Sequence, residues 1–374
     1  MIAGRSTQSL EPGPVPGFSL PERFATKGGR KSQYPIFGRP CGRIAALLLT
    51  CVARHTALRA PCTASRQRTQ KRYIDHFRLP KLSDQKGHDV IWQTSRFQID
   101  LTMPRVMGIV NVTPDSFSDG GVYFRAGDSF SEAFAHCERL LSDGADLLDI
   151  GAESSRPGAL PVPLEEELAR LLPVVRWAVK LGVPISVDSY KPEVMRAVLD
   201  LGADIVNDIW ALRQPGAAQV VAAHPKCGVC LMHMHREPKT MQMTPMQGDV
   251  VPQVLWFLKH AAQALRAVGV DKDRIVLDAG IGFGKTATQN FALLARQREL
   301  LAAGYPLLAA WSRKSSLAAV CGSTGDSAVE LPMAERMVPS VAAALLAVER
   351  GARIVRVHDV RETAQALKVW TAAR

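Results

Sequence analysis

Short apolar segments alternate with longer amphipathic segments eight times between residue 106 and the C-terminus. Each apolar segment ends in polar residues, and the segment after it repeats apolar residues at the spacing of one helix face. Strands that are apolar along nearly their whole length are typical of parallel sheets covered by helices. The sequence therefore predicts an α/β fold in which every strand is followed by a helix.

The predicted strands are 106–112, 146–153, 184–189, 203–209, 228–234, 274–280, 306–312 and 353–359. The predicted helices are 129–142, 164–181, 191–201, 215–223, 249–268, 288–303, 334–349 and 360–372. Eight such units over roughly 270 residues favour a closed (β/α)8 TIM barrel, with an open doubly wound sheet as the structural alternative. Alternation at 91–100 predicts a short N-terminal hairpin ahead of the barrel.

Residues 1–88 lack this pattern and carry the excess positive charge of the chain. The formal net charge of the 374 residues is +11, and residues 1–72 alone contain thirteen basic and two acidic residues. Frequent prolines and the lack of periodic apolar residues predict a disordered basic extension at 1–88. Its Arg-rich composition is also typical of transit peptides, but the prolines disfavour their amphipathic helix. Residues 89–374 are predicted to form the folded domain.

The folded domain is close to neutral, so no nucleic-acid partner is expected. No apolar run reaches the roughly 18 residues that cross a bilayer, so no membrane partner is expected either. The odd count of seven cysteines favours free thiols and a cytoplasmic location. Cys227 and Cys230 have the spacing of a redox or zinc motif. Because no second pair follows, we interpret them as buried thiols.

Polar residues stand at the C-terminal end of every predicted strand, where TIM barrels place their chemistry. Asp188, Asn207 and Asp278 end three strands and are expected to converge on one rim. Carboxylates and an amide there suit a flat heterocycle rich in hydrogen-bond donors. Positive charge at the same rim is expected from Arg156, Lys314, Arg356 and His358. Together these groups indicate a phosphorylated ligand with a polar ring.

Three other features have competing interpretations. Residues 279–286 nearly match a phosphate-binding P-loop, but Ala279 stands where that motif needs glycine, and the segment follows the sixth strand. His233 and His235 share the spacing of zinc ligands, but without a third ligand nearby we interpret them as core or loop-capping residues. Phe117, in the glycine-ended loop after the first strand, is either a core residue or a lid over an aromatic substrate.

Eight motifs in this order resemble the dihydropteroate synthase family of pterin-binding enzymes, over about residues 90–374. They are GIVNVTPDSFSDGG, GAESSRPGA, SVDSYKPEV, IVNDI, CLMHM, LDAGIGFGK, WSRKS and IVRVHD. The resemblance implies a transferase of folate biosynthesis that joins 6-hydroxymethyl-7,8-dihydropterin pyrophosphate to p-aminobenzoate. It also implies 7,8-dihydropteroate and pyrophosphate as products, Mg²⁺ as cofactor, a homodimer and sensitivity to sulfonamides.

The resemblance assigns roles to individual residues. Asp188, Lys314 and Arg356 are the implied catalytic residues, and Asn111 is the implied contact to magnesium-pyrophosphate. The implied substrate-binding residues are Ser155, Arg156, Asp188, Asn207, Met232, Asp278, Phe283, Ser312, Lys314, Arg356 and His358. Phe117, Asp119 and Pro157 are the implied residues of mobile loops.

Some positions depart from the family pattern, and two other functions share part of it. The departures are Ala152, Ser155, Tyr190, Ala279, Ile281 and Trp311. A pterin-dependent methyltransferase would share Asp188, Asn207 and Asp278 but has no need for the first, seventh and eighth motifs. A non-catalytic paralogue would bind pterin without turnover. The departures remove no polar group that the chemistry needs, which favours the synthase.

Overall fold

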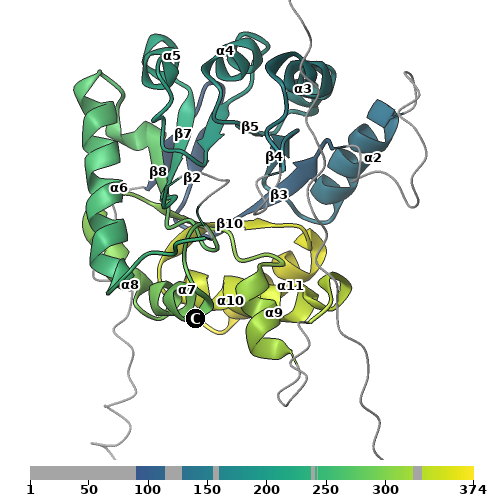
Figure 1. Cartoon of the computed structure of the whole chain (residues 1–374). Coiled ribbons are helices and arrows are strands. Elements are labelled where there is room, and N and C mark those ends of the chain that lie inside the picture. The colour runs from purple at the N-terminus through teal and green to yellow at the C-terminus, as the bar shows by residue number, and fades with distance from the viewer. Residues whose placement is uncertain (1–89, 114–128, 155–159, 237–240, 242, 323–330) are drawn as a thin grey trace, which may run out of the picture. The chain divides into compact units, whose positions relative to one another are not determined.

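A computed structural model describes residues 90–113, 129–154, 160–236, 241, 243–322 and 331–374 (Figure 1). The predicted extension at 1–88, and with it the predicted domain boundary, lies outside these residues. The same holds for five predicted site residues, which are Phe117, Asp119, Ser155, Arg156 and Pro157.

Eight parallel strands form a closed barrel in the order β10-β3-β4-β5-β6-β7-β8-β9. The strands are β3 (Arg105–Asn111), β4 (Leu147–Gly151), β5 (Ile185–Asp188), β6 (Ile205–Asp208), β7 (Gly228–Met232), β8 (Ile275–Asp278), β9 (Leu307–Ala309) and β10 (Ala352–Val357). The last strand pairs with the first, Ile354 opposite Arg105, and also with β9. This closure confirms the predicted TIM barrel and rules out the open sheet.

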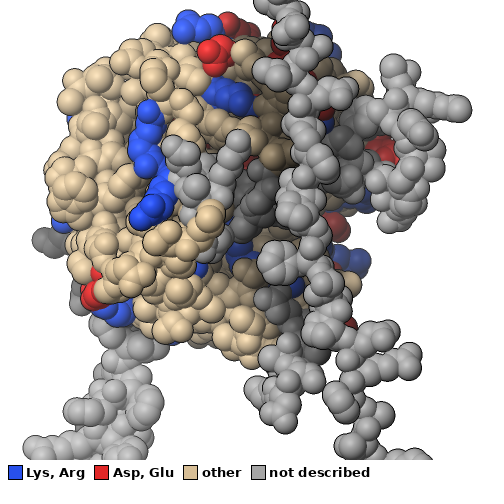
Figure 2. Space-filling model, viewed as in Figure 1, with Lys and Arg blue, Asp and Glu red and all other residues tan. Residues whose placement is uncertain are grey.

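Helices surround the barrel between its strands (Figure 1). They are α2 (Ser129–Ser142), α3 (Leu164–Ala178), α4 (Pro192–Asp200), α5 (Ala217–Ala223), α6 (Val250–Ala267), α7 (Ala287–Ala295), α8 (Gln297–Leu300), α9 (Ser315–Cys321), α10 (Met337–Glu349) and α11 (Val360–Ala372). No described helix has the length and apolar character to cross a membrane. On the face in Figure 2, most of the surface is neutral, and acidic side chains lie next to basic ones near its edges, in keeping with a nearly neutral domain.

Two details of the helices differ from prediction. The predicted helix 288–303 is divided into α7, α8 and a 3₁₀ turn (Leu301–Ala303), because the backbone leaves helical angles at Arg296, with φ −105° and ψ 17°. Gln297, the next residue, donates its side-chain amide to Ala347 O at 2.8 Å. Helix α9 was not predicted; it is as short as α5, which was predicted at 215–223, so its length alone does not explain the difference.

The predicted hairpin consists of β1 (Ile91–Gln93) and β2 (Gln98–Asp100), which pair antiparallel. Trp92 is fully buried, and its Nε1 donates to Arg274 O, just before β8, at 2.9 Å. Trp92 packs with inward-facing side chains near the starts of the barrel strands, which are Met107, Leu147, Ile205, Val276 and Ile354. The hairpin therefore closes the amino-terminal end of the barrel, so a ligand site is left to the carboxyl end.

Side chains along each strand alternate between the barrel interior and the helices. On β4, Leu147 joins the interior cluster, Leu148 and Ile150 face the helices, and Asp149 faces inward again. On β10, Ile354 faces inward and Val355 faces the helices, which turns Arg356 inward. An apolar layer thus fills the barrel, and polar side chains lie above it toward the carboxyl end.

Candidate active site

Arg356 joins two carboxylates at the carboxyl end of the barrel. Its Nε donates to Asp149 Oδ2 at 2.6 Å, and its Nη2 donates to Asp188 Oδ2 at 2.8 Å. Asp149 is fully buried, whereas the side chains of Asp188 and Arg356 remain 15% and 17% exposed. Burial opposes the guanidinium charge, but the two carboxylates outweigh it and raise the pKa of Arg356. Arg356 therefore keeps its charge at the mouth of the barrel.

Asp149 is the anchor of this polar layer. Besides Arg356 it accepts from Ser186 Oγ at 2.5 Å and from Asn207 Nδ2 at 3.1 Å. Three donors on one buried carboxylate compensate for its loss of water. Asp188 and Asn207 lie opposite each other on β5 and β6. Asp149 therefore fixes Arg356 and Asn207, while Asp188 lies beside them at the rim.

A second group joins Asp278, Phe283 and Lys314. Asp278 Oδ1 accepts from Gly280 N at 2.8 Å, and Lys314 Nζ lies 4.5 Å from the centre of the Phe283 ring. Burial raises the pKa of Asp278, although Gly280 N–H and Lys314 oppose the shift. Burial lowers the pKa of Lys314 to about 8, and the charge of Asp278 opposes that change. A carboxylate, a cation and an aromatic face thus meet at the ends of β8 and β9.

His358 and Ser312 complete the described rim. Ser312 Oγ lies 2.9 Å from His358 Nδ1, and it also accepts from His358 N at 3.1 Å. Met232 ends β7 and packs against Phe283 in a small apolar cluster. Asn111 ends β3, opposite Gly151 of β4. The rim therefore offers acids, an amide, cations and an apolar wall, which suits a polar heteroaromatic anion.

Comparison with known proteins agrees with this geometry. A model of the pterin binding enzyme family matches residues 107–358. The chain belongs to this family. Its relatives are dihydropteroate synthases, and the one from Neisseria meningitidis serogroup B is 49% identical over 286 residues, 75% of this chain and 97% of the relative.

Two solved structures of the family are similar to this chain. Dihydropteroate synthase from Burkholderia cenocepacia, solved with 7,8-dihydropteroate, has a TM-score of 0.67 and 49% identity, covering 76% of this chain and 96% of its own. The Xanthomonas albilineans synthase with 4-aminobenzoic acid has a TM-score of 0.68 and 46% identity, covering 76% and 98%. These matches confirm the predicted family, its TIM barrel and a transferase of the dihydropteroate synthase type.

All but Asn111 of the predicted site residues that the structure describes gather in two groups and one pair. One group contains Asp188, Asn207 and Arg356, which are linked through Asp149. The other contains Asp278, Phe283 and Lys314, with Met232 packed against Phe283. Ser312 and His358 form a hydrogen-bonded pair at neighbouring strand ends. The roles that the resemblance gives these residues remain proposals.

Asp149 is absent from the residues predicted above, although it holds the site together. It lies inside the predicted strand 146–153, not at the strand end where the candidates were sought. The available signal was its charge, because a carboxylate in an otherwise apolar strand needs a buried partner.

The segment that resembles a P-loop has a structural role in the loop after Asp278. Lys285 is buried, and its Nζ donates to three carbonyl oxygens, those of His233, Gly280 and Phe283, at 3.3, 2.7 and 3.2 Å. Gly280 has φ +66°, and a Cβ there would lie 1.9 Å from His233 O. The lysine and this glycine therefore shape the loop after Asp278, which agrees with the rejection of a P-loop.

The cysteine and histidine motifs are structural in the described residues. Cys227 and Cys230 are both buried and free, and Cys227 Sγ accepts from Arg274 Nη2 at 3.2 Å. His233 is buried against Phe257, edge to face, with ring centres 4.9 Å apart. His235 Nε2 accepts from Arg236 Nε at 3.3 Å. These contacts confirm buried thiols and a core histidine.

The departures from the family pattern lie mostly on the helix side of the barrel. Trp311 is 2% exposed and packs on Phe291, with ring centres 5.3 Å apart. Ile281 belongs to the same outer cluster. Tyr190 Oη donates to Glu153 Oε1 at 2.8 Å, and so supports the loop after β4. The bulk added by Trp311 is thus directed away from the mouth.

The pKa of Lys314 predicts that kcat/KM for p-aminobenzoate depends on pH. With a pKa of about 8, its ammonium is mostly protonated at pH 7 and loses its charge as the pH rises through 8. We expect kcat/KM for p-aminobenzoate to fall above pH 8 if Lys314 acts as a cation. Lys314→Arg should keep its charge across this range and lose that descending limb. A wild-type limb retained in Lys314→Arg would assign the titration to another group.

Proposed function

We propose that this chain condenses 6-hydroxymethyl-7,8-dihydropterin pyrophosphate with p-aminobenzoate, giving 7,8-dihydropteroate and pyrophosphate at the described rim. The observation that carries the proposal is the bridge from Arg356 to Asp149 and Asp188, set above an apolar layer at the one end of the barrel that the hairpin leaves open. The related synthase that was solved with 7,8-dihydropteroate supports the choice of substrates. Release of pyrophosphate in the presence of both substrates tests it.

The pterin ring would be read by Asp188, Asn207 and Asp278. A pterin presents several N–H donors along one edge, and carboxylates accept from such donors with charge-assisted hydrogen bonds. Asn207 can both donate and accept, and its Nδ2 already bonds Asp149, which orients the amide. Met232 and the Phe283 ring would supply the apolar contact that a flat ring requires.

The departing pyrophosphate would face Arg356 and His358. Negative charge builds up on the bridging oxygen as the bond to the exocyclic methylene breaks, and fixed cations at that point lower the barrier. Arg356 is held by two carboxylates, so little reorganisation is needed when this charge appears. Asp188, close to the pterin, would stabilise the positive charge left on the ring system.

The arylamine needs no strong general base. Its neutral amine is already nucleophilic, and the surplus proton can leave to water after the C–N bond forms. Lys314 lies on the Phe283 ring, beside Asp278, and would orient both rings by its charge and its stem. This assignment requires no activated nucleophile, so the hydrogen bond between Ser312 and His358 serves to hold the two side chains in place. Sulfonamides, which share the shape of p-aminobenzoate, are the proposed inhibitors.

Mg²⁺ is the proposed cofactor, held by Asn111 and by the substrate's phosphates. No group of three or more His, Cys, Asp or Glu side chains in the described residues could hold a metal ion. This fits Mg²⁺, which is often bound through few protein oxygens together with phosphates, and the amide oxygen of Asn111 at the end of β3 is such an oxygen. When bound, the ion would neutralise charge on the pyrophosphate.

Asn111→Ala should therefore raise the Mg²⁺ concentration for half-maximal activity by about tenfold. The measurement is turnover titrated with Mg²⁺ after treatment with EDTA. Thr113→Ala, at a nearby position in the same segment, serves as control and should leave the Mg²⁺ requirement near that of the wild type. An unchanged Mg²⁺ requirement in Asn111→Ala would remove Asn111 from the metal site.

Residues 89–374 are the proposed catalytic domain of a cytoplasmic homodimer. The Neisseria relative matches 75% of this chain with 97% of its own length, which supports a complete enzyme without residues 1–88. Exposed apolar side chains at Val320 of α9, and at Val338 and Leu346 of α10, support self-association. A protein truncated to 89–374 should keep full kcat and sediment as a dimer. Insolubility or loss of activity would place part of 1–88 in the fold.

A further inference from the structure

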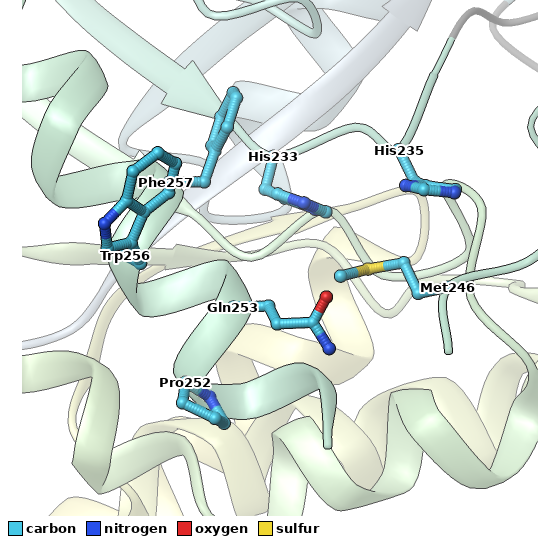
Figure 3. A pocket seen from close by; sticks show the side chains of 7 residues that line it. All are labelled: His233, His235, Met246, Pro252, Gln253, Trp256 and Phe257. Atoms are coloured by element: carbon cyan, nitrogen blue, oxygen red, sulfur yellow. The ribbon is translucent and has the colours of Figure 1, made fainter. Parts of the chain in front are cut away.

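A pocket of about 460 Å³ lies on the outer side of the barrel, between the segment after β7 and helix α6 (Figure 3). Its walls include His233, Met246, Gln253, Trp256 and Phe257. Its volume is within the range of sites for small molecules, and its mixture of aromatic walls with a few polar groups is typical of them.

This pocket is separated from the mouth by one strand end. On β7, Cys230 faces the barrel interior, Leu231 the helices and Met232 the mouth. His233 comes next, and its ring packs on Phe257 of α6, on the outer side. Its backbone N–H donates to Asp278 O at 2.9 Å. The pocket and the pterin site thus lie on opposite sides of the same segment.

The polar groups in the pocket select an uncharged ligand. His233 is only 5% exposed, and its Nδ1 is buried without a hydrogen-bond partner in the described part of the chain, so a ligand could bond only to Nε2. Burial, with Lys285 and Arg213 nearby, lowers the pKa of His233 to about 2, so the imidazole is neutral and its surroundings disfavour a cation. A metal ion is disfavoured for the same reason.

Gln253 and Trp256 indicate two further properties of the ligand, a hydrogen-bond donor and an aromatic ring. Gln253 Nε2 already donates to Gln247 O and Asp249 O, each at 2.8 Å, and Figure 3 shows its amide oxygen on the side toward His233. Trp256 is 62% exposed, and the ring of His260 already covers one face of its indole, with ring centres 3.9 Å apart, so a ligand can stack only on the other face. The pocket therefore offers an acceptor, a neutral imidazole and an aromatic wall.

We infer that this pocket is a second small-molecule site, which binds an uncharged planar heteroaromatic compound with a ring N–H. The ring stacks on the open face of Trp256, its N–H donates to Gln253 Oε1, and its ring nitrogen accepts from Nε2 of the neutral His233 imidazole. Because His233 is bonded to Asp278 through the backbone, an occupant is placed to alter pterin affinity.

Benzimidazole at pH 8 is the probe, with 1-methylbenzimidazole as the matched compound that lacks the N–H. The full-length protein, saturated with 7,8-dihydropteroate to block the mouth, is titrated by NMR with the histidine side chains labelled with ¹⁵N. Benzimidazole should shift the ring ¹⁵N signals of His233, and the methylated compound should bind about fivefold more weakly. Binding is measured without turnover, so its failure is distinct from failure of the proposed reaction.

Trp256→Ala should weaken the binding of benzimidazole by about tenfold, since it removes the exposed indole on which the ligand stacks. His233→Phe keeps an aromatic ring of similar size but removes its hydrogen bond, and should weaken the binding of benzimidazole by about fivefold. His224→Phe is the control, because His224 also has a buried Nδ1 without a described partner but lies outside the pocket. Equal affinity in Trp256→Ala, no shift at His233, or displacement by 7,8-dihydropteroate would each overturn the inference.

Discussion

Arg356→Ala should lower kcat by about a thousandfold, because it removes the cation that faces the departing pyrophosphate. Two nitrogens of this side chain reach Asp149 and Asp188 at 2.6 and 2.8 Å, so its position is fixed by two carboxylates. The same change leaves the fully buried Asp149 without its ion partner, which costs about 3–5 kcal/mol of folding free energy. Turnover by pyrophosphate release and Tm by calorimetry measure the two effects.

Arg356→Lys separates chemistry from folding. Lysine keeps a positive charge near Asp149, but one ammonium cannot reproduce a planar fork that serves two carboxylates. We expect Tm close to that of the wild type and kcat lower by about a hundredfold. Arg353→Ala is the control, because Arg353 lies on the same strand at the opposite end and donates to Thr102 O. Near-normal kcat in Arg356→Lys would refute the proposed role in anion binding.

Asp188→Asn should weaken the binding of the pterin substrate by about a hundredfold. A charge-assisted hydrogen bond to the ring contributes about 1.5–3 kcal/mol, and the amide cannot accept at both of its atoms. The substitution also releases one nitrogen of Arg356 from its partner. Isothermal titration calorimetry with the pterin pyrophosphate gives Kd directly.

Asp204→Asn is the matched control for Asp188→Asn. Asp204 is also a carboxylate paired with an arginine, Arg96, and is more deeply buried than Asp188, but it lies just before β6, at the amino-terminal end of the barrel. We expect a lower Tm and an unchanged Kd for the pterin. If Asp188→Asn bound pterin as tightly as Asp204→Asn does, Asp188 would have no place in the pterin site.

The fold was predictable because each strand and most helices can be recognised from a short stretch of neighbouring residues. Each barrel strand shows its apolar run within a few residues, and all eight were placed correctly to within a few residues at their ends. The division of the helix at Arg296 was not predicted, because no glycine or proline marks it in the sequence, and the neighbouring bond of Gln297 joins Ala347, fifty residues away. Helix α9 was missed, although α5 of the same length was predicted.

The site was predictable only in part. Asp188, Asn207 and Asp278 were visible because they end strands, and topology then brings strand ends together. Asp149 was missed because its importance depends on Arg356, 207 residues away in the chain. The pocket beside His233 depends on how α6 packs against the end of β7, which no local pattern reveals.

Product formation by the purified protein tests the central claim most directly. With the pterin pyrophosphate, p-aminobenzoate and Mg²⁺, the enzyme should form 7,8-dihydropteroate and pyrophosphate in equal amounts, and omission of either substrate should abolish both. Mass spectrometry and a pyrophosphate assay read the two products. Folded protein that binds the pterin but releases no pyrophosphate, or that instead transfers a methyl group from methyltetrahydrofolate, would contradict the proposal.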